Sequence, residues 1–170
     1  MGEDEGDSKG AAARRWLESM VAKPPSQPSS SSTSRVVGDG GFFNALTLWD
    51  LRVSLTHAGR ALCSFRVPRH LTDSDGNWIP GAMSTVIDLV GAAAILSEKG
   101  ELRVSADMDI TYLSPAKIDD EVEVDARVLG HKGRVSAVLV ELRKKRNGER
   151  VALGKLWMAS GRPLIKSSKL

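Results

Sequence analysis

The stretch from residue 81 to residue 99, GAMSTVIDLVGAAAILSEK, decides how this chain folds. Apolar residues lie on nearly every side of a helix built from it, and Gly100 stands directly after it, where a helix C-cap favours glycine. A helix that is apolar all round is buried within its protein. The sequence therefore predicts one long central helix over 81–99 that the rest of the chain must enclose.

The segments on both sides of this helix alternate apolar and polar residues with a period of two, which is typical of β-strands. Two such runs precede the helix, at 51–56 and 61–67, and the Ala58-Gly59 turn between them predicts a β-hairpin. Four more strands are expected after it, at 102–112, 121–129, 134–144 and 150–160. The turns expected between the later strands are Gly130-His131-Lys132-Gly133 and Asn147-Gly148, the second a type I′ signature.

This order of elements predicts an α+β fold in which an antiparallel sheet of five or six strands wraps around one long helix, the hotdog architecture. We expect the folded domain to span residues 35–163. Residues 1–34 are expected to be a disordered extension, because an acidic, glycine-rich start is followed by a Pro- and Ser-rich linker at 24–32. Within it, only residues 11–23 could form a short helix.

Residues 164–170 are expected to form an exposed tail that ends in Ser168-Lys169-Leu170. A C-terminal S-K-L tripeptide is the address that the peroxisomal import receptor reads. Such a receptor binds the terminal carboxylate together with the three side chains, so the signal works only at a chain end. The sequence therefore predicts this receptor as a partner and the peroxisome as the location, which favours acyl-CoA chemistry.

The composition narrows the remaining classes of function. The 170 residues suffice for one domain with a core, and 24 basic against 21 acidic residues leave a net charge of only +3. With aromatic residues at 5%, nucleic acid is not an expected partner. No membrane span is expected, nor a metal site, because His and Cys residues show no paired spacing. The single cysteine, Cys63, lies in a strand-like run and is expected in the core.

Asp88 is the unusual residue of the central helix, because a carboxylate in an apolar helix costs free energy unless something pairs with it or uses it. Gly81 lies seven residues earlier, almost two turns away and on the same face. The N–H groups at this helix end suit a carbonyl oxygen that gains negative charge. The pair fits acyl transfer to water, with Asp88 activating the water or attacking the carbonyl itself. A purely structural cap or ion pair is the alternative.

The stretch 104–117, VSADMDITYLSPAK, resembles the corresponding segment of hotdog acyl-CoA thioesterases of the acyl-coenzyme A thioesterase 13 type. The upstream Thr85-Val86-Ile87-Asp88 agrees with that family, and Asp75-Gly76-Asn77-Trp78 is similar to its plant members. The resemblance covers about residues 50–160. It implies hydrolysis of a fatty or aromatic acyl-CoA to the free acid and coenzyme A, without a cofactor, by a homotetramer built from dimers with active sites at the subunit interfaces.

The resemblance also implies roles for individual residues. Asp88 would be the general base or nucleophile, and Ser105 would hold the attacking water from the facing subunit. Gly81 would help to polarise the carbonyl, and Asp73 stands where animal members carry asparagine in the catalytic set. Coenzyme A is expected to bind along two segments, namely Tyr112, Leu113, Ser114, Pro115, Ala116 and Lys117, and the hairpin of His131, Lys132, Gly133 and Arg134.

The start of the helix departs from the family pattern. Animal members carry His-Gly-Gly where this chain has Ile79-Pro80-Gly81, and proline lacks the N–H that the first family glycine donates to the thioester oxygen. Losing one such donor typically costs about a hundredfold to a thousandfold in rate. Two alternatives follow: a non-catalytic acyl-CoA-binding or assembly protein on the same scaffold, and an enoyl-CoA hydratase or dehydratase, which would need a histidine beside Asp88.

Overall fold

The computed structural model describes residues 2–21 and 41–160. The expected linker at 24–32 and the expected tail at 164–170, with Ser168, Lys169 and Leu170, lie outside the described residues.

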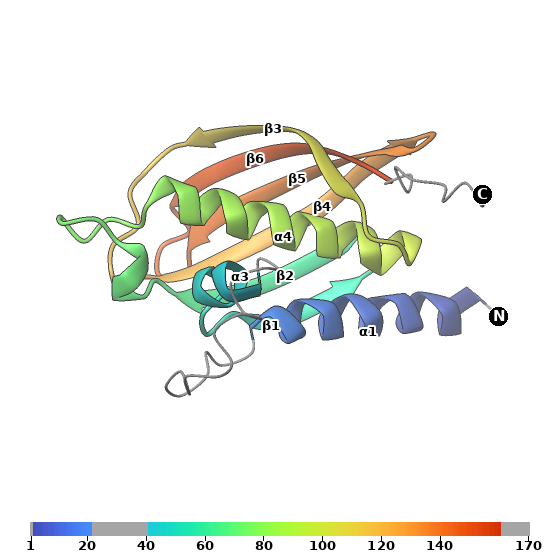
Figure 1. The fold of residues 1–170 in the computed structure, drawn as a ribbon, viewed down its shortest axis with the longest axis horizontal. Coiled ribbons are helices and arrows are strands. Elements are labelled where there is room, and N and C mark those ends of the chain that lie inside the picture. Colours follow the sequence, from blue (N-terminus) through green and yellow to red (C-terminus); the bar gives the residue numbers. More distant parts are fainter. Residues whose placement is uncertain (1, 22–40, 161–170) are drawn as a thin grey trace, which may run out of the picture.

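One antiparallel sheet of six strands forms the body of the molecule, with the strand order β1-β2-β4-β5-β6-β3 (Figure 1). The strands are β1 (Arg52–His57), β2 (Arg60–Arg66), β3 (Val104–Tyr112), β4 (Glu121–Lys132), β5 (Val135–Lys144) and β6 (Arg150–Ala159). Every neighbouring pair is antiparallel. The hotdog fold predicted from the sequence is confirmed, and β1 and β3 are the two edges of its sheet.

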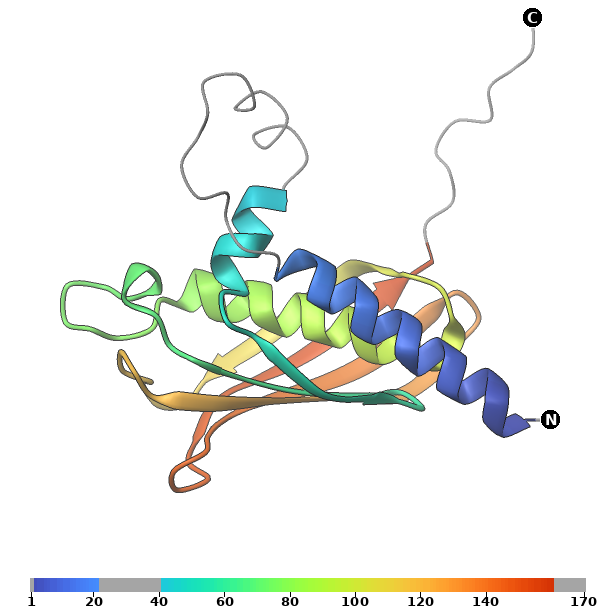
Figure 2. The ribbon, with the colours of Figure 1, turned by 90° about the horizontal axis from the view of Figure 1, so that it is seen from below.

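The long helix α4 (Pro80–Lys99) lies across the concave face of this sheet (Figures 1 and 2). Pro80 occupies its first turn, where a missing N–H costs nothing. Gly100 ends it in the left-handed conformation, at φ 72°, and its N–H bonds to Leu96 O at 2.9 Å. By length and composition alone α4 could cross a membrane, with a mean hydropathy of 1.4, but 67% of its most apolar 18-residue window is buried inside the protein, as in a core helix.

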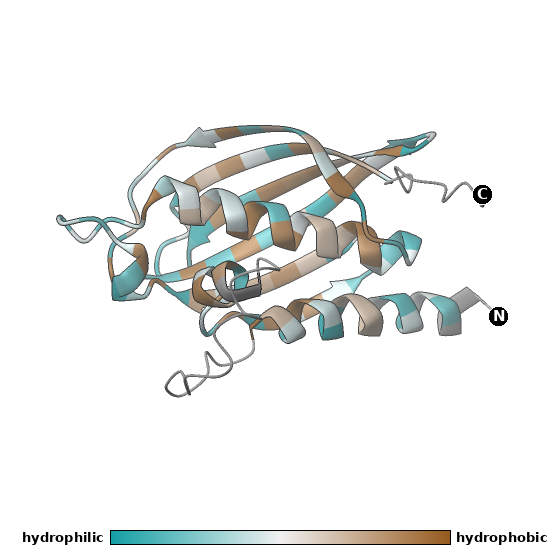
Figure 3. Cartoon of the chain, in the orientation of Figure 1, coloured by the Kyte–Doolittle hydropathy of each residue, from teal (hydrophilic) through white to brown (hydrophobic). Residues whose placement is uncertain are grey.

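The core lies between α4 and the sheet and is built from apolar residues of both. Hydrophobic residues (brown) recur along the strands and along α4 in Figure 3. Val86, Ile87 and Val90 of the helix are completely buried. Cys63 of β2 is equally buried, and this burial raises the pKa of its thiol to about 12, as expected for a packed core thiol rather than a nucleophile.

Two glycines set the distance between helix and sheet. A Cβ added at Gly154 of β6 would lie 2.6 Å from Cγ2 of Ile87, which is shorter than a carbon–carbon contact allows. Gly91 of α4 also faces the sheet, since its Cβ would lie 3.4 Å from Val140 and 3.5 Å from Met158. The small size of Gly91 therefore serves the packing of the helix against the sheet.

An N-terminal helix, α1 (Gly2–Met20), runs alongside α4 in the opposite direction and also contacts β1 (Figure 2). It begins earlier than the short helix expected at 11–23, and it is packed rather than free. Ala13 and Leu17 are completely buried, and Thr56 Oγ1 donates a hydrogen bond of 2.8 Å to Gly10 O. Gly10, in the middle of α1, permits this close approach to β1, since a Cβ there would overlap Thr56 O. A short helix not expected from the sequence, α3 (Gly41–Thr47), precedes β1.

The three turns differ in how well the sequence predicted them. Ala58 and Gly59 both have positive φ, 45° and 81°, so the type I′ turn lies here. Asn147-Gly148 belongs to a longer connection, in which Lys144 N bonds to Glu149 O at 2.9 Å and only Gly148 has positive φ. The expected turn at 130–133 is also shorter, because β4 continues through a bulge to Lys132.

Replacing Gly154 with alanine should lower the free energy of unfolding by about 1–3 kcal/mol, because the new methyl group overlaps Ile87 between two packed layers. Urea denaturation measures this change. Gly130→Ala is the matched control, since a Cβ at Gly130 meets nothing within 4 Å and should change stability by less than about 0.5 kcal/mol. Equal effects of the two substitutions would contradict this account of the helix–sheet contact.

Candidate active site

The first turn of α4 offers one free backbone donor. The N–H groups of Ala82 and Met83 both bond to Ile79 O, at 3.1 and 3.2 Å, and Pro80 has none. Gly81 is exposed, and its missing side chain leaves open space around it. From the sequence, any of the backbone N–H groups at this helix end could stabilise the oxyanion. In the first turn of α4, the Gly81 N–H is the one that is free to do so.

Asp88 lies two turns further along α4 and is half-buried. Ser105 of β3 donates a short hydrogen bond from Oγ to Asp88 Oδ1. Among residues 2–21 and 41–160, the partner of the carboxylate is thus a hydroxyl on the edge strand, and no ion pair to a cation is formed there. Both residues belong to one chain, whereas the resemblance implied that Ser105 acts from the facing subunit.

A β-bulge turns Ser105 toward the helix. Ser105 pairs with Met158 and Asp107 pairs with Trp157, so β3 carries one extra residue, Ala106, at this point. Met158 is completely buried on the helix side of β6, and Ser105 opposite it faces the same side. Without the bulge, the alternation of side chains counted back from Tyr112 would place Ala106, and not Ser105, on the helix-facing side of β3. Bulges commonly re-aim a side chain beside a functional site.

A pocket of about 370 Å³ lies beside the first turn of α4. It is lined by Asp73, Asn77, Trp78, Pro80, Met83, Tyr112, Leu113, Ser114 and Pro115. Tyr112 joins the two walls, since its hydroxyl donates a 3.2 Å hydrogen bond to Pro80 O. The structure thus brings Asp73 together with most of the expected 112–117 segment. Sequence reasoning did not assign Asn77, Trp78 or Met83 to the site, although their nearness to the helix start was a usable signal.

Asp73 holds its own loop together. Its Oδ1 accepts the backbone N–H groups of Asp75 and Asn77 at 2.9 and 2.8 Å, and its Oδ2 accepts the Asn77 amide at 3.1 Å. The hydrogen bonds from the Asn77 backbone and side chain keep the pKa of Asp73 below its usual value. Asp73 is therefore an ionised loop residue in the pocket wall. The side-chain amide in this part of the wall belongs to Asn77.

The last two residues of the 112–117 segment are structural. Ala116 is completely buried, and its carbonyl accepts the Trp78 N–H at 2.8 Å. Lys117 N bonds to Asp120 Oδ2 at 2.8 Å, and Lys117 Nζ donates to Asp75 O at 3.2 Å. Lys117 thus fastens the loop of Asp73 while its ammonium group stays near the pocket rim.

The second expected coenzyme A segment lies at the other end of α4. His131 contacts Glu98, one residue before the helix ends, at 3.1 Å. Lys132, Gly133 and Arg134 are exposed at the tip of the same hairpin. A 20-residue helix is about 30 Å long, so one chain does not bring the 112–117 and 131–134 segments together. In the part of the chain that the structure describes, no three His, Cys, Asp or Glu side chains group as a metal site requires.

Comparisons with known proteins identify the family of this chain. Residues 75–151, from the loop of Asp73 to the start of β6, match the family model described as "Thioesterase superfamily". A human protein named acyl-coenzyme A thioesterase 13 is 33% identical over 98 residues, which cover 57% of this chain and 70% of the human protein.

Two solved structures share the fold. Zebra fish thioesterase superfamily member 2 superposes with a TM-score of 0.72 at 24% identity, covering 89% of this chain and 97% of its own. A hypothetical thioesterase from Streptococcus pneumoniae, solved with coenzyme A, gives a TM-score of 0.61 at 18% identity and covers 64% and 86%. The family model, the human relative and the shared fold agree: this chain belongs to the thioesterase superfamily.

Proposed function

We propose that this protein is an acyl-CoA thioesterase that hydrolyses a fatty or aromatic acyl-CoA to the free acid and coenzyme A. The observation that carries the proposal is the Asp88–Ser105 pair, which lies two helical turns from the free Gly81 N–H and near a pocket at the helix start. The names of the relatives support acyl-CoA as the class of substrate.

The geometry accommodates hydrolysis of the thioester by either of two routes. Ser105 donates its hydrogen bond to Asp88 Oδ1, so Asp88 Oδ2 is the oxygen that accepts a proton or attacks the substrate. As a general base, Asp88 takes a proton from water while the hydroxyl adds to the thioester carbon; the C–S bond then breaks, and the thiolate takes the proton back. As a nucleophile, Asp88 itself adds to that carbon, coenzyme A leaves, and water hydrolyses the resulting anhydride.

Charge that develops on the carbonyl oxygen would be stabilised by the Gly81 N–H and by the positive end of α4. Pro80 removes a second donor from this position, so we expect a slow enzyme. The same observation favours the second candidate, an acyl-CoA-binding protein without turnover. A hydratase finds less support, because His70 bonds to Leu46 O and His131 to Ser136, both away from Asp88.

We also propose that the active site is completed by a second copy of the chain. Strand β3 is a sheet edge, and its large apolar side chains are open to solvent, with Val104, Met108 and Tyr112 exposed by 63%, 40% and 46%. A long, apolar, uncovered edge favours pairing with another strand. Antiparallel pairing of two β3 strands about a two-fold axis would set the pocket of one copy beside the 131–134 hairpin of the other. Two such dimers would give the expected tetramer.

For location we propose the peroxisome, on the basis of Ser168-Lys169-Leu170 alone. An acyl-CoA substrate is compatible with that compartment, and the import receptor would be the partner of these three residues.

Asp88→Asn should lower kcat by about a hundredfold to ten-thousandfold, because the amide neither accepts a proton nor attacks a carbonyl. Steady-state assays with a panel of acyl-CoAs, detecting the free thiol, measure this. Asp109→Asn removes another carboxylate, an exposed one on β3, and is the control that should keep its activity. If the native protein and the Asp88→Asn variant both bind acyl-CoA and neither releases thiol, the binding-protein candidate is correct.

Mixing two inactive variants should restore hydrolysis if each site is built from two chains. One variant carries Asp88→Asn, and the other carries Lys132→Ala with Arg134→Ala. After the subunits exchange, half of the dimers are mixed and each mixed dimer has one intact site, which gives about a quarter of native activity. Activity equal to the mean of the two separate variants would show that each site lies within one chain.

A fluorescent fusion carrying the native C-terminus should accumulate in peroxisomes, and the same fusion lacking Leu170 should remain in the cytosol, because the receptor reads the terminal tripeptide. Leu164→Ala, upstream of the tripeptide, is the control and should not change the distribution. Peroxisomal accumulation without Leu170 would contradict the targeting proposal.

A further inference from the structure

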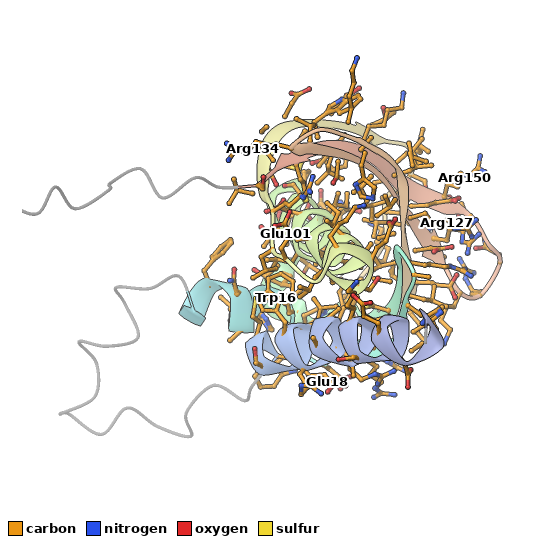
Figure 4. The ribbon with its side chains drawn as sticks, turned by 90° about the vertical axis from the view of Figure 1, so that its right-hand side faces the viewer. Trp16, Glu18, Glu101, Arg127, Arg134 and Arg150 are labelled. Atoms are coloured by element: carbon orange, nitrogen blue, oxygen red, sulfur yellow. The ribbon has the colours of Figure 1, made fainter. Side chains whose placement is uncertain are left out.

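A cluster of polar side chains lies where α4 ends, away from the pocket, and we call its members Glu98, Arg103, His131 and Ser136 the hairpin clamp. Figure 4 looks onto this end of the molecule, with Glu101 and Arg134 labelled beside it. Arg103 Nη1 donates to Ser136 Oγ at 2.8 Å, and Ser136 Oγ lies 2.7 Å from His131 Nδ1. His131 Nε2 lies 3.1 Å from Glu98 Oε2.

Ser136 Oγ is the centre of the clamp, because it accepts a hydrogen bond from Arg103 and shares a second one with His131 Nδ1. On the other side of the imidazole ring, Nε2 faces the Glu98 carboxylate at close range without a hydrogen bond. One chain of contacts thus runs from Arg103 through Ser136 and His131 to Glu98.

The Ser136–His131–Glu98 order matches that of a hydrolytic triad, but burial excludes this use. Ser136 is completely buried, and its oxygen is already bonded to Arg103. Only 6% of the Arg103 side chain is exposed, and Glu101 accepts both its Nε and Nη2 at 3.1 and 2.8 Å. A substrate cannot reach these groups, so the clamp acts by holding chain segments together.

The segment that gains most from the clamp is the end of β4. β2 pairs with β4 only as far as Arg127, so among the described strands the last residues of β4 pair with β5 alone, whereas β5 itself pairs with β6 from Val135 onward. The β4 side of the hairpin tip is therefore the side that lacks a second strand neighbour. His131 and Ser136 flank the tip, and their bonds to Arg103 and Glu98 fix it against the end of α4. Arg134 Nη2 adds a 2.6 Å hydrogen bond to Ser160 O.

We propose that the hairpin clamp is a positioning network that holds Lys132 and Arg134 in place to bind the phosphates of coenzyme A. This inference rests on the proposed function. It moves His131 from the set of direct ligands, where the resemblance placed it, to the support of that set. A charge-assisted bond to phosphate depends on donor position, and an ordered tip loses less conformational entropy when the ligand binds.

The test is equilibrium binding by the full chain, measured calorimetrically with two probes: coenzyme A, and pantetheine, which lacks the phosphorylated nucleotide. Ser136→Ala removes the link between Arg103 and His131 and should weaken coenzyme A binding about tenfold, with pantetheine binding unchanged within about twofold. Glu98→Gln, at the more exposed rim, should act in the same direction and decides the matter if Ser136→Ala fails to fold. Ser64→Ala on β2 is the control.

Coupling provides a second readout that general destabilisation does not give. In a chain that already carries Lys132→Ala and Arg134→Ala, Ser136→Ala should cause little further loss of coenzyme A affinity. Equal weakening of both probes, full additivity with the hairpin substitutions, or native protein that binds coenzyme A no better than pantetheine would each overturn the proposal. Because no hydrolysis is involved, native protein that binds coenzyme A through the clamp without cleaving thioesters would refute only the proposed enzymatic function.

Discussion

The packing of α4 against the concave face of the sheet is the constraint on which the other features depend. The helix is held at a close distance because Gly154 and Gly91 leave room for the side chains opposite them. At that distance, Asp88 on the flank of the helix reaches Ser105 on the edge strand. A wider separation between the two layers would leave a half-buried carboxylate without its hydroxyl partner.

The same packing places the two regions that we propose for ligand binding at opposite ends of one helix. The pocket lies where α4 begins, and the basic hairpin lies where it ends, fastened there by Arg103, Ser136, His131 and Glu98. The open edge at β3 supplies a physical reason for two chains to pair, and a two-fold axis would bring unlike ends together. Catalysis and coenzyme A binding would then be assigned to different chains at each site.

Local patterns in the sequence predicted the elements that local forces determine. The apolar run at 81–99, its glycine cap and the Ala58-Gly59 turn all lie where the sequence indicated. A carboxylate in an apolar helix pointed to Asp88 and the resemblance supplied Ser105, but no periodicity reveals that one extra residue at Ala106 turns Ser105 inward. Contacts between distant segments give no local signal either: Thr56 donates a hydrogen bond to Gly10 O, 46 residues away, and thereby ties α1 to β1.

We propose that Asp88, Ser105 and the Gly81 N–H form one reaction centre. A crystal structure with a non-hydrolysable acyl-CoA analogue would show whether they do. We expect the carbonyl oxygen at about 3 Å from Gly81 N, Asp88 Oδ2 facing the carbonyl carbon, and the nucleotide phosphates beside Lys132 and Arg134 of a second chain. A bound analogue whose carbonyl lies away from both Gly81 and Asp88 would contradict it.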